Sequence, residues 1–178
     1  FFLISFQKND TLVTPPGSHR AGKVEGIQEQ NTPVSSLKKH ILRRHGSFWR
    51  SKVRLLLVTG EHQGKVGMDY FRRHLPTIRR QFASLQMEVQ PLSMEEYAEL
   101  KTLGLDGVMV YQETWHEAQY ARHHLRGKKQ DFFWRLETPD RLGQAGIDKI
   151  GLGALIGLSD SWRVDCYMMA EHLLWLQQ

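Results

Sequence analysis

The stretch VRLLLVTGEHQGK, residues 53–65, decides the fold, because an apolar strand runs there directly into a polar turn that contains glycine. Apart from Arg54, residues 53–58 are branched and apolar, which predicts a strand buried on both faces. The strand ends at Thr59-Gly60-Glu61-His62, a hydroxyl, a flexible backbone, a carboxylate and an imidazole. Ligands of parallel α/β folds bind at the carboxyl ends of the strands, so this turn is the first candidate site.

The same strand-then-helix unit repeats along the rest of the chain. Further strands are expected at residues 86–90, 108–111 and 149–155, and helices at residues 66–85, 93–103, 115–125, 131–145 and 161–178. Pro76 is expected to kink or split the first helix, and Thr138-Pro139 to restart the fourth. The order βαβαβαβα predicts an α/β fold with a parallel sheet. Four units make half of an eight-stranded barrel or most of a doubly wound sheet, and periodicity leaves both open.

Residues 1–52 differ from the rest in composition. They hold nine Lys and Arg against three Asp and Glu, a net charge of +6, whereas residues 53–178 have a net charge of −1. A basic arm that binds nucleic acid or anionic lipid is one interpretation. The absence of a packable pattern favours a disordered segment instead. We therefore predict a basic, disordered segment at 1–52 and a folded domain at 53–178 that gives no electrostatic case for nucleic acid.

The single cysteine, Cys166, excludes an internal disulfide framework and any multi-cysteine metal site within this chain. It fits a reducing cytoplasmic setting. No apolar run approaches the ~18 residues of a membrane span, and no signal peptide is evident. We expect a cytoplasmic protein that does not contact the membrane. The chain begins at Phe1 and ends inside an expected helix, so we also expect it to be a fragment.

Polar side chains follow three of the four expected strands. They are Thr59, Glu61 and His62 after the first, Gln90 after the second, and Gln112, Glu113 and Thr114 after the third. Because the carboxyl ends of parallel strands meet at one edge of a sheet, these side chains predict a shared site at that edge.

Three other patterns resemble ligand-binding motifs, and each departs from the motif. Residues 60–65 miss the P-loop spacing by one residue and lack its Ser or Thr. His116, His123 and His124 lack a further zinc ligand of matching geometry. Gly151, Gly153 and Gly157 are one residue off the dinucleotide fingerprint, and they suit either close strand packing or an exposed backbone that binds a flat ligand such as adenine.

Long segments of the chain resemble the 2-iminoacetate synthase family, the radical S-adenosylmethionine tyrosine lyases of thiamine thiazole biosynthesis. They include LLLVTGEHQ at 55–63, LQMEVQPL at 85–92, DGVMVYQET at 106–114, DFFWRLETPDRLG at 131–143 and KIGLGALIGL at 149–158. The resemblance covers about residues 55–178 and implies a partial radical-SAM (βα) TIM-like barrel. Residues 1–52 do not resemble that family, which suggests a frame-shifted reading of the gene.

The resemblance implies a role for eight residues in binding S-adenosylmethionine. Thr59-Gly60-Glu61 matches the Gly-Gly-Glu turn that holds the methionine amino group, with Thr59 in place of the first glycine. Glu113 and Arg135 match contacts to the ribose and methionine ends. Residues 153–160 match the G-x-I-x-G-x-x-E adenine strand, which adds Gly153, Leu155 and Gly157.

The activity implied by the resemblance is cleavage of the Cα–Cβ bond of tyrosine to 2-iminoacetate and p-cresol, with thiazole synthase as a partner. A [4Fe–4S] cluster starts this chemistry in the family. Its C-x-x-x-C-x-x-C loop lies upstream of the strand at 53–58, where this chain has no cysteine. We therefore expect the chain to be inactive alone. The alternatives are a non-catalytic α/β module that retains part of an S-adenosylmethionine site, and the tyrosine lyase of hydrogenase maturation.

Overall fold

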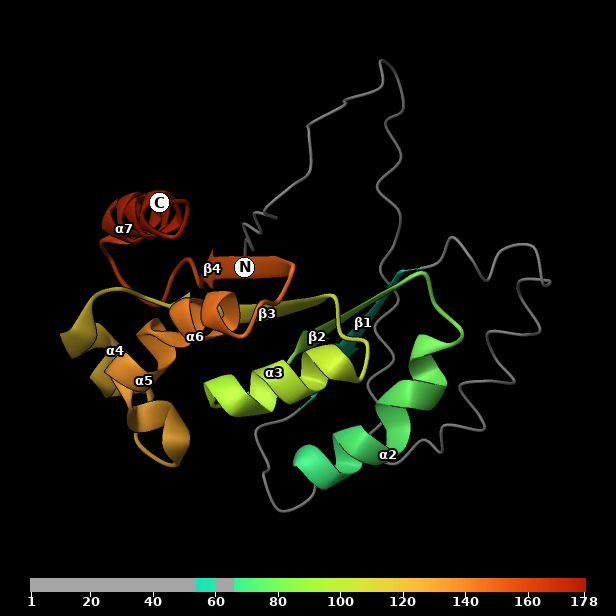
Figure 1. Cartoon of the computed structure of the whole chain (residues 1–178). Coiled ribbons are helices and arrows are strands. Elements are labelled where there is room, and N and C mark those ends of the chain that lie inside the picture. The colour runs from blue at the N-terminus through green and yellow to red at the C-terminus, as the bar shows by residue number, and fades with distance from the viewer. Residues whose placement is uncertain (1–53, 60–65) are drawn as a thin grey trace, which may run out of the picture.

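The computed structural model describes residues 54–59 and 66–178, and four parallel strands form one sheet within these ranges (Figure 1). The predictions for residues 1–52, Gly60 and Glu61 lie outside the described residues. The strands are β1 (Arg54–Val58), β2 (Ser84–Glu88), β3 (Gly107–Glu113) and β4 (Lys149–Ala154). Their order in the sheet is β1-β2-β3-β4. This sequential order is typical of a barrel segment, whereas a doubly wound sheet reverses its order at a switch point.

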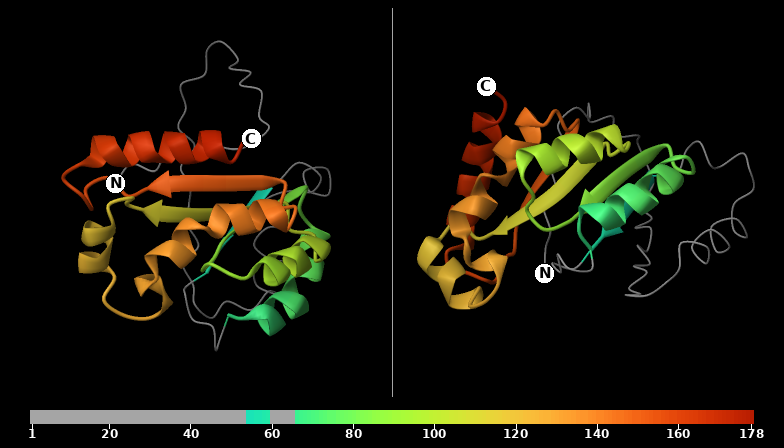
Figure 2. Two further views of the ribbon diagram at one scale, coloured as in Figure 1. Left: turned by 60° about the vertical axis from the view of Figure 1, so that its left-hand side comes forward. Right: turned by 60° about the horizontal axis from the view of Figure 1, so that its bottom comes forward.

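A helix or helices follow each strand. They are α2 (Met68–Arg79), α3 (Met94–Thr102), α4 (Glu117–His123), the 3₁₀ helix η2 (Lys128–Gln130), α5 (Phe132–Leu136), α6 (Thr138–Gln144) and α7 (Trp162–Trp175). Figure 2 shows α7 running alongside β4, at the opposite end of the sheet from β1. None of the helices in the described ranges has the length and apolarity of a membrane span.

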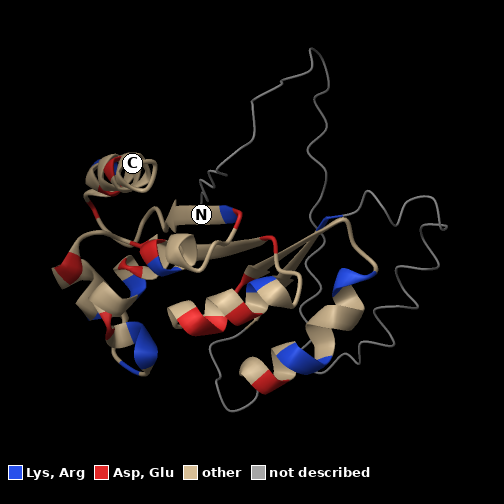
Figure 3. Cartoon of the chain, viewed as in Figure 1, with Lys and Arg blue, Asp and Glu red and all other residues tan. Residues whose placement is uncertain are grey.

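The hydrophobic core lies between the sheet and helices α2, α3 and α6. Alternate residues of each strand point to this core, for example Leu85 and Met87 of β2 and Val108 of β3. Phe71 and Leu75 belong to the apolar stripe of α2 and are buried against them. The charged residues of α2 and α3 lie off these buried stripes (Figure 3). The other face of the sheet, here called the inner face, carries the intervening strand residues.

Two expectations for the first strand and helix were wrong. Residues of β1 alternate between partly buried and exposed, because β1 lies at an edge of the described sheet and only one of its faces is covered by helices. The first helix ends at Arg79, and Leu85 lies in β2. Asp106 explains this boundary, since its carboxylate accepts a hydrogen bond from the Leu85 N–H at 2.7 Å. Pro76 lies inside α2, which is not split.

Local signals mark the bounds of other elements, and the predicted restart of the fourth helix is confirmed. Ser93 and Glu96 form a reciprocal capping box at the start of α3. A second helix, α6, begins at Thr138 with Pro139 in its first turn. The third strand is longer than expected and extends to Glu113.

A buried carboxylate attaches α7 to the end of β3. Asp165 of α7 accepts hydrogen bonds from the Thr114 hydroxyl and from the Trp115 backbone N–H, both at 2.8 Å. Thr114 and Asp165 are almost fully buried. The outer side of α7 is apolar and exposed, as at Tyr167 and Trp175. Asp165 is therefore the principal polar contact that positions this helix.

We predict that Asp165→Ala lowers the free energy of unfolding by about 1–3 kcal/mol, because it leaves the buried Thr114 hydroxyl without its acceptor. Asp165→Asn keeps one acceptor and should cost less. Urea unfolding measures both. The exposed Asp160→Asn is the control and should stay within about 0.5 kcal/mol of the parent. Equal effects of the Asp160 and Asp165 substitutions would contradict this role.

Candidate functional site at the carboxyl ends of the strands

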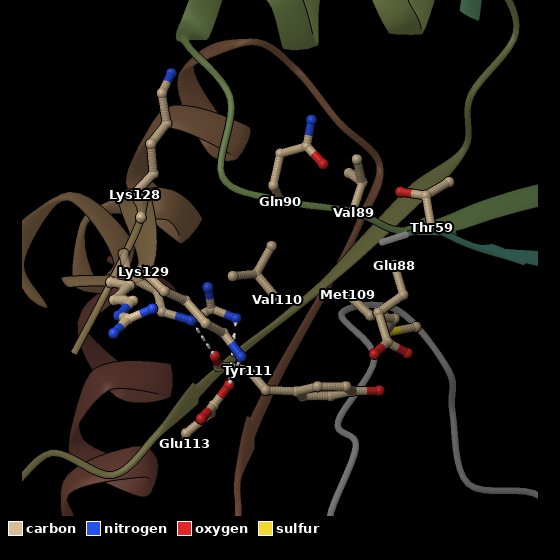
Figure 4. Close-up of a pocket in the computed structure, with 13 residues that line it drawn as sticks. Thr59, Glu88, Val89, Gln90, Met109, Val110, Tyr111, Glu113, Lys128 and Lys129 are labelled. Carbon is tan, nitrogen blue, oxygen red and sulfur yellow. Dashed lines mark hydrogen bonds and ion pairs between the residues drawn. The ribbon is translucent and has the colours of Figure 1, made fainter. Parts of the chain in front are cut away.

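A cavity of about 560 Å³ opens where β1, β2 and β3 end (Figure 4). The strands contribute a set of polar and apolar side chains, and the loop before α5 contributes cations. The lining residues are Thr59, Glu88, Val89, Gln90, Met109, Val110, Tyr111, Glu113, Arg126, Gly127, Lys128, Lys129 and Arg135. Four cations and two carboxylates thus face one cavity, a composition that suits a ligand with both anionic and cationic groups.

Glu113 is the centre of the charged cluster in this cavity. Its carboxylate lies 2.6 Å from Lys129 Nζ, 2.7 Å from His124 Nε2 and 3.6 Å from an Arg135 guanidinium nitrogen. The Arg135 Nε–H also donates to the Tyr111 carbonyl at 2.7 Å, which fixes the guanidinium against β3. Glu113 therefore joins two cations, Lys129 and Arg135, and the His124 ring, all from the segment that follows β3.

The backbone at Glu113 is strained to reach these partners. Its φ is +73°, a left-handed conformation that non-glycine residues seldom adopt. The register between β3 and β4 shifts between Tyr111 and Glu113, and the Glu113 carbonyl accepts from Leu155 N–H at 2.7 Å. A bulge of this kind redirects a side chain at a strand end, and such strain concentrates at functional sites.

The rings of Tyr120 and His124 pack next to the charged cluster around Glu113. The His124 ring stacks on Tyr120 with ring centroids 4.0 Å apart. His124 Nδ1 lies 2.8 Å from the Tyr120 carbonyl, while Nε2 faces Glu113. The two ring nitrogens thus lie between the Tyr120 carbonyl and the Glu113 carboxylate, which fixes the orientation of the ring. The Tyr120 hydroxyl donates to the Lys129 carbonyl at 2.7 Å, which ties the cationic loop to the same ring.

The two carboxylates of the cavity have opposite environments. Burial favours a higher pKa for Glu113, but Lys129, Arg135 and His124 outweigh it and lower the pKa below its ordinary value. Burial also raises the pKa of Glu88, and there the more distant Arg135 and Lys129 compensate only in part. Burial and the neighbouring Glu88 raise the pKa of Tyr111 to about 12. The charged form of Glu113 is therefore stabilised by its neighbours, whereas burial destabilises the charged form of Glu88.

The glycines of β4 make room for side chains of β3. A Cβ at Gly153 would lie 2.4 Å from Tyr111 Cδ1, and one at Gly151 would lie 1.9 Å from Met109 Sδ. The structure thus supports the close-packing interpretation of these two positions. Gly157 has a φ of +103° with open space around it, which suits a turn that only glycine adopts easily.

The structure brings three predicted cofactor-binding residues, Thr59, Glu113 and Arg135, into one cavity. Gly153 lies in β4, Leu155 and Gly157 lie in the loop that follows β4, and none of the three lines this cavity in the described part of the chain. The prediction that strand-end residues gather is thus met by Thr59, Gln90 and Glu113. Gln112 and Thr114 differ, because both are buried away from the cavity.

Sequence reasoning missed the roles of Lys129, His124 and Glu88 in this cavity. The pair Lys128-Lys129 directly before the aromatic run was a signal for an anion partner. His124 was weighed as a zinc ligand, although its partner is a carboxylate. No group of three or more His, Cys, Asp and Glu with metal-binding geometry occurs among residues 54–59 and 66–178.

Comparison with known proteins confirms the resemblance seen in the sequence. Over 124 residues, 70% of this chain, the sequence is 89% identical to the 2-iminoacetate synthase of Salmonella typhimurium (strain LT2) and 87% identical to that of Escherichia coli (strain K12). The chain spans about a third of the length of these curated relatives, 33% in each case. No family model matches the chain.

Solved structures confirm the fold. The FeFe-hydrogenase maturase HydG from Carboxydothermus hydrogenoformans matches with a TM-score of 0.65 and 32% identity over 70% of this chain and 29% of that chain. A second HydG structure, described as a maturase of the [FeFe]-hydrogenase, matches with a TM-score of 0.66 and 30% identity over the same shares. The described strands and helices are therefore part of a radical-SAM, TIM-barrel-like fold.

We predict that Gly153→Ala lowers the free energy of unfolding by about 1–3 kcal/mol, because the new methyl group must displace the Tyr111 ring. In a Tyr111→Ala background the cost should fall by more than half, a coupling that a double-mutant cycle measures. Gly143→Ala is the control, since nothing lies near its Cβ position in α6, and it should be stabilising or neutral. Equal costs of Gly153→Ala in both backgrounds would contradict the packing explanation.

We also predict that Glu113→Gln costs about 1–3 kcal/mol at neutral pH, because the buried partners of the carboxylate lose their counter-charge. The pKa of Glu113 is lowered, so its contribution is present above the ordinary value of 4.5 and is lost as pH falls through the lower folded value. The difference between the variant and the parent should therefore shrink in acid.

Urea unfolding at several pH values measures that difference. Glu99→Gln is the control, because Glu99 also has a lowered pKa but its ion pair with Arg72 is exposed, and its effect should be smaller. A Glu113→Gln effect that grows as pH falls would have the wrong sign for this account.

Proposed function

We propose that residues 55–178 are the S-adenosylmethionine-binding part of a radical tyrosine lyase that cleaves the Cα–Cβ bond of tyrosine to 2-iminoacetate and p-cresol for thiamine thiazole synthesis. The observation that carries the proposal is the 89% identity to 2-iminoacetate synthase. The gathering of Thr59, Glu113 and Arg135, the residues that match the family's cofactor contacts, in one cavity also supports it.

The groups in the cavity fit the polar ends of S-adenosylmethionine. The Thr59 hydroxyl and the Gln90 amide oxygen are buried there without a hydrogen-bond partner within the described ranges. Buried polar atoms are costly unless they are paired, so these atoms suit a ligand that brings donors. Glu113 would accept hydrogen bonds from the ribose hydroxyls, and Arg135 would pair with the methionine carboxylate. The cofactor supplies the radical chemistry when it is bound.

In that proposal, the residues of this chain bind and orient S-adenosylmethionine. Arg135 is held by the Tyr111 carbonyl and by Glu113, so its guanidinium is positioned before a ligand arrives. His124 and Lys129 keep Glu113 ionised, which makes it a strong acceptor for hydroxyl donors. Glu61 would accept a hydrogen bond from the amino group of the cofactor. Gly60 and Glu61, the other two predicted residues of that turn, lie outside the described residues.

The [4Fe–4S] cluster of the proposed activity does not fit this chain. Such clusters are held by cysteine thiolates, and the sequence contains one cysteine. We therefore propose that this chain does not turn over alone, and that residues 1–52 are a frame-shifted segment without the cluster-binding loop. The proposal also includes adenine binding by Gly153, Leu155 and Gly157. It further includes a cytoplasmic location and thiazole synthase as a partner.

A tyrosine lyase of hydrogenase maturation is the second candidate, because the structural neighbours are HydG maturases. The identity of 32% to HydG against 89% to 2-iminoacetate synthase favours the thiamine enzyme.

Calorimetric titration with S-adenosylmethionine tests the binding part of the proposal. The parent chain should bind it, and Arg135→Leu should weaken binding by about tenfold or more, equivalent to ~1.4 kcal/mol. Arg122→Leu is the control, because Arg122 is an exposed arginine of α4 that does not line the cavity. No binding by the folded parent, or equal loss in both variants, would contradict the proposal.

Anaerobic reconstitution with iron and sulfide tests the statement about the cluster. We expect no [4Fe–4S] absorbance from this chain, because it lacks three thiolates. A stoichiometric cluster would show that the cysteine count does not limit assembly.

A further inference from the structure

We propose that Glu88 is a specificity-determining residue that accepts a hydrogen bond from the phenol hydroxyl of an aromatic substrate, and so distinguishes tyrosine from phenylalanine. This inference rests on the proposed function, because it names a residue that would select the substrate of that reaction. It starts from a carboxylate that the proposed cofactor contacts do not use.

Glu88 differs from the other carboxylate of the cavity in its partners. Glu113 is paired with Lys129, His124 and Arg135 at 2.6 to 3.6 Å. Glu88 has no ion pair within 4.0 Å among the described residues, and its polar neighbour is the Tyr111 side chain, whose pKa burial and the Glu88 charge raise. Figure 4 shows the Tyr111 ring extending away from Glu113 toward the Glu88 carboxylate. The cavity therefore has a cation-rich end at Glu113 and a second end where Glu88 keeps acceptor capacity for a ligand.

The surroundings of Glu88 on the inner face are apolar. In the sheet register, Val58 of β1 and Met109 of β3 are its neighbours on the two sides. Residues in register on adjacent parallel strands point to the same face, so both side chains flank the carboxylate. Tyr111 lies one step nearer the carboxyl end of β3 on that face and is packed over Gly153. An apolar collar around one hydrogen-bond acceptor matches a phenol, which is a flat apolar ring with a hydroxyl at its tip.

A partly buried carboxylate in these apolar surroundings destabilises the folded state, which argues that Glu88 has a function. Burial raises the pKa of Glu88, because the folded state stabilises the charged form less than water does. A glutamine or leucine there would avoid that cost. Residues that are retained at the expense of stability are common where a site has a function.

Hydrogen bonding is also the effective means of selecting a hydroxyl. A site built around a substrate hydroxyl rejects the analogue that lacks it by up to about 10⁴–10⁵, because its buried polar group is then left unpaired. An apolar pocket alone would discriminate the two rings by far less. Glu88 would supply this discrimination for tyrosine.

Binding of tyrosine and phenylalanine to the full 178-residue chain, in the presence of S-adenosylmethionine, tests the inference. We expect the parent to prefer tyrosine by about tenfold or more. Glu88→Leu should bring the ratio of the two dissociation constants close to one, and the near-isosteric Glu88→Gln should give an intermediate ratio. Glu117→Leu is the control, because Glu117 is an exposed glutamate of α4, and it should keep the parent ratio.

Tyr111→Phe separates substrate recognition from a structural role. If Glu88 serves only to hold the Tyr111 hydroxyl, Tyr111→Phe should abolish the preference as Glu88→Leu does. If Glu88 accepts from the substrate, Tyr111→Phe should retain the preference. Thermal unfolding reports whether each variant folds, and Glu88→Gln should melt at or above the temperature of the parent because it removes a buried charge.

The outcomes also distinguish this inference from the proposed function. Binding of S-adenosylmethionine with equal affinity for tyrosine and phenylalanine, or a preference that survives Glu88→Leu, overturns the role of Glu88 alone. Loss of S-adenosylmethionine binding with a retained, Glu88-dependent preference overturns the proposed cofactor site instead. A preference that disappears in Glu88→Leu and persists in Tyr111→Phe supports the inference.

Discussion

The ionised carboxylate of Glu113 organises the carboxyl end of this sheet. It stands at a bulge with φ at +73°, and it meets Lys129, His124 and Arg135, all supplied by the segment between β3 and α6. That segment contains only short helices, so ionic contacts and the stacked Tyr120 ring, more than helix propensity, set its position. The direction in which Arg135 points, and the shape of the cavity, follow from this one cluster.

The two carboxylates of the cavity differ in how far neighbouring cations compensate their negative charge. Lys129 and Arg135, together with a hydrogen bond from His124, lower the pKa of Glu113, whereas burial raises the pKa of Glu88 and the charges near it compensate only in part. The first environment suits a permanent anion that binds polar ligand groups. The second suits a hydrogen-bond acceptor that recognises a single hydroxyl group. One strand-end cavity thus has two chemically distinct ends, which is the arrangement expected where a cofactor and a substrate must meet.

The sequence predicted the βα order because apolar periods are local, and it predicted the gathering of Thr59, Gln90 and Glu113 because parallel strands end together. It did not predict that β1 would be exposed on one face, since burial depends on which strand lies at an edge. It also missed the His124–Glu113 pair, because eleven residues and a turn separate the partners. The close packing of Gly153 against Tyr111 depends on sheet register, which periodicity does not encode.

Hydrogen–deuterium exchange with and without S-adenosylmethionine tests most directly whether the Glu113 cluster is the centre of the site. The account predicts slower exchange on ligand binding in two separate segments, the end of β3 at 110–115 and the loop at 126–135, with α2 unchanged as an internal reference. Protection confined to α2 and α3, or no change at 126–135 under saturating ligand, would contradict it.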